Sequence, residues 1–201
     1  MIENLVLASG NAHKAAESEA WFCERGWNLK VHDASKFGGM DGCVESADDF
    51  EGNAKIKAKL LLSKVPEDHW VLADDSGLVV DSLGGAPGVY SARFAGEGAT
   101  DRQNRELLLE RMRKVSSERK RSARFVCVLA LAQKRKKIRI YRGECEGRIL
   151  TRADGAGGFG YDPIFAPKGA RRSFARFEPS EKNKISHRGL ALEKLEKDLT
   201  P

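Results

Sequence analysis

Two adjacent acids follow a short apolar stretch of the chain. Asp74 and Asp75 come after residues 71–73, Val-Leu-Ala, and before Ser76 and Gly77. Two carboxylates cannot both be buried without partners, because desolvation of each is costly, so we expect them at the edge of a sheet. A hard divalent cation such as Mg²⁺ would satisfy them there, orient water and neutralise phosphate charge. By itself the motif fits a hydrogen-bonded Asp-Ser-Gly turn equally well.

A second polar segment, residues 9–14, separates a predicted strand from a predicted helix. It consists of Ser9, Gly10, Asn11, Ala12, His13 and Lys14. The unpaired N–H groups of a helix N-terminus, with a lysine in the first turn, suit a phosphate group. The segment lacks the GxxxxGK[ST] pattern of a Walker A loop. Capping by Ser9 or Asn11, with Lys14 in solvent, explains the same residues without a ligand.

An acidic cluster precedes the next predicted helix. Its members are Glu45, Asp48, Asp49 and Glu51. Acids at this place complement the helix dipole, so the cluster is explained without a metal. Only one of its members need be a metal ligand.

Two further features lie in the last third of the chain. Residues 155–160 form a glycine-rich loop with one aromatic, Phe159, which could stack on a base or pack in the core. His187 and Arg188 precede the last predicted helix, and Lys182 comes five positions before His187. Such side chains donate to carbonyl and phosphate oxygens, although on a surface turn they are ordinarily solvated. Together, the carboxylate pair, residues 9–14 as a phosphate cradle, the stacking loop and the donor cluster make one coherent nucleotide site.

Short apolar runs alternate with helical patterns along the chain. The predicted strands are residues 5–8, 27–32, 71–73, 78–80, 125–132 and 138–142. The predicted helices are residues 12–24, 54–65, 101–115 and 190–199, and Thr100 or Asp101 is the N-cap of the third. Residues 134–137 turn the chain between two of the strands. The alternation, with one hairpin, predicts an α/β domain with a mixed sheet.

The composition indicates a globular protein. The 201 residues fit one domain or two closely joined lobes, and 41% hydrophobic with 32% charged residues excludes a disordered chain. No apolar run approaches the roughly 20 residues of a transmembrane helix, and the first ten residues carry no basic segment, so we expect neither membrane insertion nor secretion. Four widely spaced cysteines form no CxxC pair, which is typical of reduced thiols in a cytoplasmic protein. The net charge of +6 indicates a polyanionic partner.

The motifs as a set resemble the inosine/xanthosine triphosphate pyrophosphatases, which hydrolyse deaminated purine nucleoside triphosphates to the monophosphate and pyrophosphate. The resemblance runs nearly end to end and in order. It covers Ser9-Gly10-Asn11 with Lys14 and Glu17, Phe50 with Asn53-Ala54 and Lys57-Ala58, and residues 73–78, 83–93, 158–165 and 186–189.

This resemblance implies a fold and an activity. The fold is an elongated mixed β-sheet flanked by helices, in two lobes with the active site in the cleft between them. Residues 1–201 form one pyrophosphatase domain. The activity is hydrolysis of ITP, dITP and XTP, which cleanses the nucleotide pool. Mg²⁺ is the implied cofactor, a homodimer the implied assembly and the cytoplasm the implied compartment, without a membrane and with no nucleic acid expected as partner.

The resemblance also implies roles for individual residues. Asp75 is the general base and a metal ligand, Asp74 supports it and is also a metal ligand, and Glu45 is the other metal carboxylate. Lys14 shares in catalysis. The substrate is bound by Ser9, Gly10, Asn11, Ala12, His13, Lys14, Ser76, Phe159, Gly160, Tyr161, Asp162, Lys182, His187 and Arg188. Among these, Phe159 stacks on the purine, and His187 and Arg188 donate to its oxygens. An adenine amino group would leave those donors unpaired, at about 1–3 kcal/mol per group.

One residue departs from the family pattern. Gly52 stands where many members carry Glu before Asn53-Ala54, which could weaken the surroundings of the metal, and the role of neighbouring Glu51 stays open.

Two other functions compete with this one. A basic nucleic-acid-binding protein would use residues 114–124 and 134–142 and bind with a steep salt dependence. A Maf-like nucleotide pyrophosphatase would have related architecture and other base preferences, although His187 and Arg188 argue against it.

Overall fold

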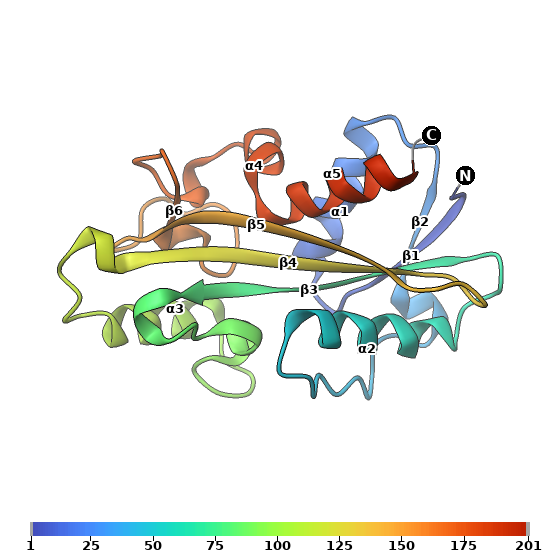
Figure 1. Cartoon of the computed structure of the whole chain (residues 1–201), viewed down its shortest axis with the longest axis horizontal. Helices are drawn as coiled ribbons and strands as arrows, with labels where there is room; N and C mark the ends of the chain where they lie inside the picture. The colour runs from blue at the N-terminus through green and yellow to red at the C-terminus, as the bar shows by residue number, and fades with distance from the viewer. Residues whose placement is uncertain (1, 200–201) are drawn as a thin grey trace. The chain divides into compact units, whose positions relative to one another are not determined.

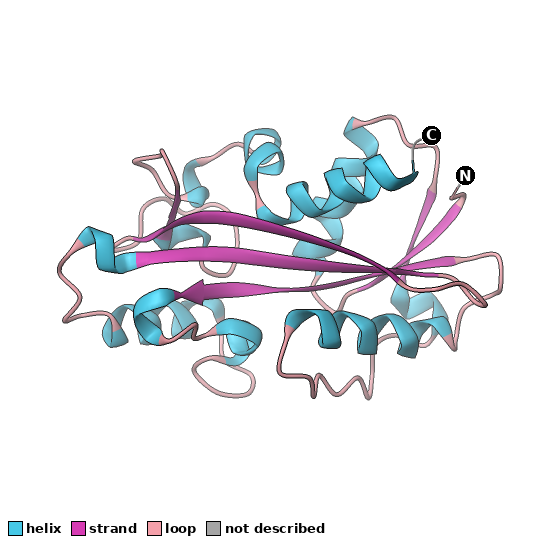
Figure 2. Ribbon diagram, in the orientation of Figure 1, coloured by secondary structure: helices cyan, strands magenta, loops and turns pink. Residues whose placement is uncertain are grey.

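The computed structural model describes residues 2–199, and within them the strands form one mixed sheet in the order β2-β1-β3-β4-β5-β6. The strands are β1 (Asn4–Ala8), β2 (Lys30–Asp33), β3 (Trp70–Val80), β4 (Ser122–Ala132), β5 (Arg139–Ile149) and β6 (Phe165–Pro167). β1 pairs in parallel with β2 and β3, whereas β5 and β6 are antiparallel. The expected α/β class with a mixed sheet flanked by helices is therefore confirmed (Figure 2).

The helices agree with most of the periodic patterns. They are α1 (Ala12–Glu24), α2 (Phe50–Leu62), α3 (Asp101–Arg111), α4 (Pro179–Ile185) and α5 (His187–Leu199). Short 3₁₀ turns cover Ala34–Phe37, Asp81–Leu83, Gly88–Arg93, Glu118–Arg121, Asp162–Ile164 and Phe174–Arg176. Thr100 caps α3 in a capping box with Gln103, as expected. The periodic patterns do not predict α4, since its seven residues are too few for an apolar stripe. None of the helices within residues 2–199 is long and apolar enough to span a membrane.

The described residues form two compact units. The first takes the chain up to Asp75, then Cys127–Gly143 and the residues from Arg188 on, and the second takes Ser76–Val126 and Glu144–His187. In the first unit α1 and α5 lie on one side of the sheet and α2 on the other (Figure 1). The apolar core of this unit includes Leu5, Leu7, Trp21, Phe22, Leu129, Leu131, Leu192 and Leu195. The core of the second unit includes Leu78, Leu108, Met112, Phe125, Ile149, Ile164, Phe165 and Phe174.

The segment around the two acids differs from the expectation. β3 is one continuous strand from Trp70 to Val80, and it lies between β1 and β4. Asp74 and Asp75 are therefore in an interior strand, so both the placement at a sheet edge and the Asp-Ser-Gly turn are wrong. β1 pairs with β3 only as far as Ala73, so the acids begin where β1 ends. Their carboxylates are buried because cations from other elements reach them.

The departure at Gly52 has a steric reason. Asp49 caps α2 by accepting a hydrogen bond from the backbone N–H of Gly52 at 2.6 Å. The preceding loop then folds back so tightly that a Cβ at position 52 would overlap the Cβ of Ala47. A glutamate at position 52 would require this loop to move, so the glycine and the loop conformation belong together.

We expect Gly52→Ala to lower the free energy of unfolding, because overpacking of this kind costs about 1–3 kcal/mol and the gain in helix propensity recovers only about 1 kcal/mol. Ala47→Gly in the same chain should restore most of the loss. Urea denaturation of the two single variants and the double variant measures the coupling. Additive effects would show that the two positions do not press on each other.

Candidate active site

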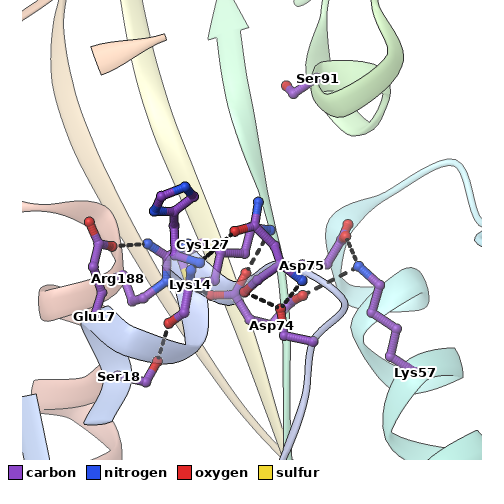
Figure 3. A network of polar contacts seen from close by, with 12 residues as sticks. Lys14, Glu17, Ser18, Lys57, Asp74, Asp75, Ser91, Cys127 and Arg188 are labelled. Atoms are coloured by element: carbon purple, nitrogen blue, oxygen red, sulfur yellow. Dashed lines mark hydrogen bonds and ion pairs between the residues drawn. The ribbon is translucent and has the colours of Figure 1, made fainter. Parts of the chain in front are cut away.

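Asp74 is held by two cations of the first unit (Figure 3). Its Oδ1 accepts a hydrogen bond from Lys14 Nζ at 3.0 Å, and its Oδ2 accepts one from Arg188 Nε at 2.7 Å. Cys127 Sγ lies 3.3 Å from the same Oδ2. Both oxygens of Asp74 are thus engaged by groups from α1, α5 and β4.

Arg188 is buried and joins two carboxylates. It is 1% exposed, and besides Asp74 it pairs with Glu17 of α1. Burial by itself would lower the pKa of Arg188, but the carboxylates of Asp74 and Glu17 raise it overall. The alternative of a His-Arg pair solvated on a surface turn is therefore wrong, because both residues are buried.

Asp75 has a different environment. Its Oδ1 accepts a hydrogen bond from Lys57 Nζ at 2.6 Å, and the same ammonium pairs with Glu45 Oε1 at 2.9 Å. Asp75 Oδ2 is buried and has no hydrogen-bond partner within the described residues. Burial raises the pKa of Asp75, and Lys57 opposes this rise only in part. Asp75 is therefore the carboxylate of the pair with an oxygen available for chemistry.

Lys57 is part of a sequence motif, but the motif by itself predicts no role for it. It belongs to the buried stripe of α2, where an aliphatic residue is usual. Burial lowers its pKa, but Asp75 and Glu45 raise it overall, so it stays charged. A lysine at a core position of an amphipathic helix was the available signal, since such a charge needs an acid from elsewhere in the chain.

Glu45 and Asp75 fit a divalent cation as a pair of carboxylates. Within the described residues, no group of three or more His, Cys, Asp or Glu side chains is placed to hold a metal ion. Mg²⁺ requires only one or two carboxylates when water and substrate phosphates complete its coordination. The free Oδ2 of Asp75 and the shared Lys57 ammonium mark a place where positive charge is stabilised. Asp74 is less suited as a ligand because both its oxygens are engaged.

Residues 9–14 cap the N-terminus of α1, which agrees with the alternative that needs no ligand. Asn11 Oδ1 accepts hydrogen bonds from the backbone N–H groups of His13 and Lys14, at 2.9 and 3.3 Å. Ser9 Oγ accepts one from the N–H of Asn11. Lys14, however, does not lie in solvent, since it pairs with Asp74. Gly10 and Ala12 are exposed. This segment therefore offers a half-buried lysine and exposed backbone to a phosphate.

The second unit contains another buried ion pair. Lys182 Nζ of α4 lies 2.7 Å from Asp162 Oδ2, which also accepts a hydrogen bond from the N–H of Phe159 at 2.9 Å. The Lys182 ammonium lies 4.8 Å from the centre of the Phe159 ring. Gly158 has φ +70°, and a Cβ there would overlap Asp162. Asp162 thus fixes the glycine-rich loop and the position of its aromatic residue.

The same loop is also fastened to its neighbours. Asp101 accepts a hydrogen bond from the N–H of Gly160 at 2.6 Å, and the Tyr161 hydroxyl donates to the carbonyl of Ser91 at 2.9 Å. Tyr161 is buried, so in this structure it is a packing residue. Ser76 is half-buried in β3.

His187 begins α5 and is 5% exposed. Its ring stacks on Phe125 of β4, with centroids 4.7 Å apart and planes 12° apart. The histidine is thus oriented by an aromatic face. Such a ring keeps its direction toward a ligand far better than a solvated one.

Several basic residues of the two segments considered for nucleic acid have partners in the chain. Arg124 pairs with Asp81 at 3.0 Å, and Arg139 pairs with Asp198 at 2.9 Å. Lys134 donates to the carbonyl of Val65 at 2.7 Å. The two ion pairs lower the charge available to a polyanion, whereas the contact of Lys134 holds its ammonium against the chain without neutralising it.

The comparisons with known proteins agree over almost the whole chain. The model of the Ham1 family matches residues 5–198. A protein of Opitutus terrae named dITP/XTP pyrophosphatase is 44% identical over 191 residues, covering 93% of this chain and 94% of that protein. One of Bacillus anthracis with the same name is 44% identical over 200 residues, covering 98% and 96%. The solved Ham1 proteins of Coxiella burnetii and Staphylococcus aureus are 39% and 33% identical, with TM-scores of 0.86 and 0.85. The first covers 99% of this chain and 98% of its own, and the second 98% of each.

The Lys57–Asp75 ion pair should affect how the free energy of unfolding depends on pH. Lys57→Met leaves Asp75 and Glu45 without their shared cation, so the folded-state pKa of Asp75 rises further above its unfolded value. The folded state then binds more protons than the unfolded state, and the free energy of unfolding falls as pH rises from about 4 to 8. Urea denaturation across this range should show a steeper fall for the variant than for the unmodified chain. Parallel curves would contradict the assigned pairing. Lys55→Met, an exposed lysine of the same helix, is the control.

Proposed function

The chain belongs to the Ham1 family, and on that basis we propose that it hydrolyses deaminated purine nucleoside triphosphates to the monophosphate and pyrophosphate, with dITP, ITP and XTP as substrates. The names of its relatives support this substrate class. The structural observation that carries the proposal is Asp75, a buried carboxylate with one oxygen on Lys57 and the other without a partner.

Hydrolysis of a phosphoanhydride requires an attacking water in line with the leaving group and neutralised phosphate oxygens. Asp75 Oδ2 accepts the proton of that water in our proposal, and its raised pKa makes it a better base than an exposed carboxylate. Lys57 holds Asp75 in position through Oδ1 and keeps it ionised before the transfer.

We assign the metal site to Glu45 and Asp75. Mg²⁺ bound there would acidify water and neutralise phosphate charge. The chain itself supplies Lys14 from α1 and Lys182 from α4 as further positive charges for the triphosphate. Asp74 has a positioning role, since it orients Lys14 and Arg188.

Recognition of the base falls to residues of the second unit. Phe159 provides a face for stacking, with Lys182 and Asp162 fixing its loop. His187, oriented by Phe125, donates to the oxygen at the purine 6-position. Arg188 is engaged by Asp74 and Glu17, so its contribution to base recognition is to anchor the start of α5 beside His187.

The proposal extends to assembly and compartment. We propose a homodimer with Mg²⁺ as cofactor, working in the cytoplasm, and residues 1–201 acting as one pyrophosphatase domain. All four cysteines lie in the described residues and are free thiols, which supports a reducing compartment.

The proposed function is tested with a panel of nucleoside triphosphates and Mg²⁺. We expect pyrophosphate release from dITP, ITP and XTP with kcat/KM at least about tenfold higher than for dATP, because the 6-amino group of adenine leaves the donors to the 6-oxygen unpaired, at about 1–3 kcal/mol per group. Chelation of the metal with EDTA should abolish turnover, and added Mg²⁺ should restore it. Equal rates on dATP and the three deaminated substrates would contradict the recognition of the 6-oxygen, and turnover confined to nucleotides of other bases would favour a Maf-like enzyme.

Asp75→Asn tests the assigned base. Asn retains an oxygen for Lys57 but cannot accept a proton from water, so kcat should fall by at least about 10²-fold while the variant stays folded. Asp68→Asn, an exposed acid of the same unit, should leave kcat unchanged. Steady-state pyrophosphate release and circular dichroism measure the two quantities. A fully active Asp75→Asn variant would rule out this role.

A further inference from the structure

A cavity of about 550 Å³ lies in the second unit, apart from the residues assigned above. Its walls come from the 3₁₀ turn Glu118–Arg121, which precedes β4, and from the end of β5 with the residues that follow it. Residues 171–176 contribute the remaining wall through Arg171 and Arg176. The start of β4 and the end of β5 lie side by side in the sheet (Figure 1).

The cavity has a strong excess of positive charge. Its lining includes Arg121, Arg148, Arg152, Arg171 and Arg176. Only two acids line it, Glu118 and Asp154, so three positive charges are in excess. Arg152 and Arg171 are exposed and form no ion pair within residues 2–199. Two arginines of the cavity are therefore available to a ligand without breaking an existing contact.

Arg121 is a buried charge in the cavity wall. It is 3% exposed, and its guanidinium donates to the backbone carbonyls of Met112, Val115, Ile149 and Leu150 at 2.7–3.2 Å. Carbonyl groups are dipoles without net charge, and no carboxylate of the described residues pairs with this guanidinium. Burial accordingly lowers the pKa of Arg121. The wall thus keeps a full positive charge that no carboxylate within residues 2–199 pairs with.

The opposite wall is fixed by Asp154. Its carboxylate pairs with Arg176 at 2.5 Å and accepts a hydrogen bond from the N–H of Ser173 at 3.1 Å. Gly155 has φ +87°, and a Cβ there would lie 2.8 Å from Arg176 Cγ. Because Asp154 is already occupied by these donors, it cannot neutralise the other arginines. The cavity is therefore a prebuilt cationic site.

From this geometry we propose that the cavity is a second binding site, for a small phosphorylated anion such as an inorganic oligophosphate. Guanidinium groups bind phosphate oxygens through paired hydrogen bonds, and several of them around one cavity match a multiply charged ion. The volume is that of a small-molecule pocket, whereas a nucleic acid strand requires an extended groove along the surface. The inference does not rest on the proposed function, since none of the catalytic residues lines this cavity.

The test uses tripolyphosphate as the probe, in isothermal titration calorimetry with EDTA present so that no metal-dependent turnover occurs. The test variant is Arg152→Ala/Arg171→Ala, which removes the two unpaired arginines. The control is Arg102→Ala/Arg113→Ala, two exposed arginines outside the cavity that remove the same charge. Circular dichroism and thermal unfolding verify that both variants fold.

We expect the control to bind like the unmodified chain and the test variant to lose one binding event or weaken it at least about tenfold. The KM of the test variant for dITP should stay unchanged. The titration does not depend on pyrophosphatase activity, so it can be interpreted even if the chain has none. Identical stoichiometry and affinity in the test and control variants would overturn the proposal. The proposal would also be overturned if the test variant lost binding to a labelled single-stranded oligonucleotide but still bound tripolyphosphate like the control. The cavity arginines would then bind a nucleic acid.

Discussion

The burial of two adjacent carboxylates in an interior strand is the constraint on which this structure depends. Asp74 and Asp75 point away from each other along β3, and removing either charge from water is costly unless a cation accompanies it. Lys14, Lys57 and Arg188 supply those cations from three different helices. Because the acids lie inside the sheet, α1, α2 and α5 must each place a basic side chain against them. A buried arginine at the start of α5 is otherwise a costly choice.

The same constraint separates the two acids by role. Asp74 has both oxygens engaged, so it holds Lys14 and Arg188 in place. Asp75 has one oxygen free and a raised pKa, so it is the acid suited to proton transfer. The second unit contains a comparable buried ion pair. Lys182 Nζ and Asp162 Oδ2 lie 2.7 Å apart, and Asp162 also holds the loop of Phe159 in place. In each unit a buried lysine–aspartate pair positions a group that we propose to meet the substrate.

The net charge of +6 is distributed unevenly. Some basic residues of the hairpin and of β4 are tied to acids or carbonyls, as Arg139 is to Asp198 and Arg124 to Asp81. Arg152 and Arg171 are not, and they stand beside the buried Arg121 in one cavity. Part of the excess that the composition assigned to a polyanion in general thus lies at a place sized for a small anion.

Local patterns determined much of the fold before any tertiary contact was considered. Apolar periodicity and caps predicted α1, α2 and α3, because spacing and turn chemistry are properties of neighbouring residues. The motifs 9–14, 74–77, 158–163 and 186–188 contain most residues of the candidate site, and the resemblance to a family implied their roles. Tertiary structure alone decided that β3 continues through the acids, that Arg188 is buried, and that Lys57 is the cation paired with Asp75. It also brought Gly52 into contact with Ala47 and placed five arginines from separate segments around one cavity. Burial and charge pairing depend on residues far apart in the chain, and a linear pattern carries no record of which of them meet.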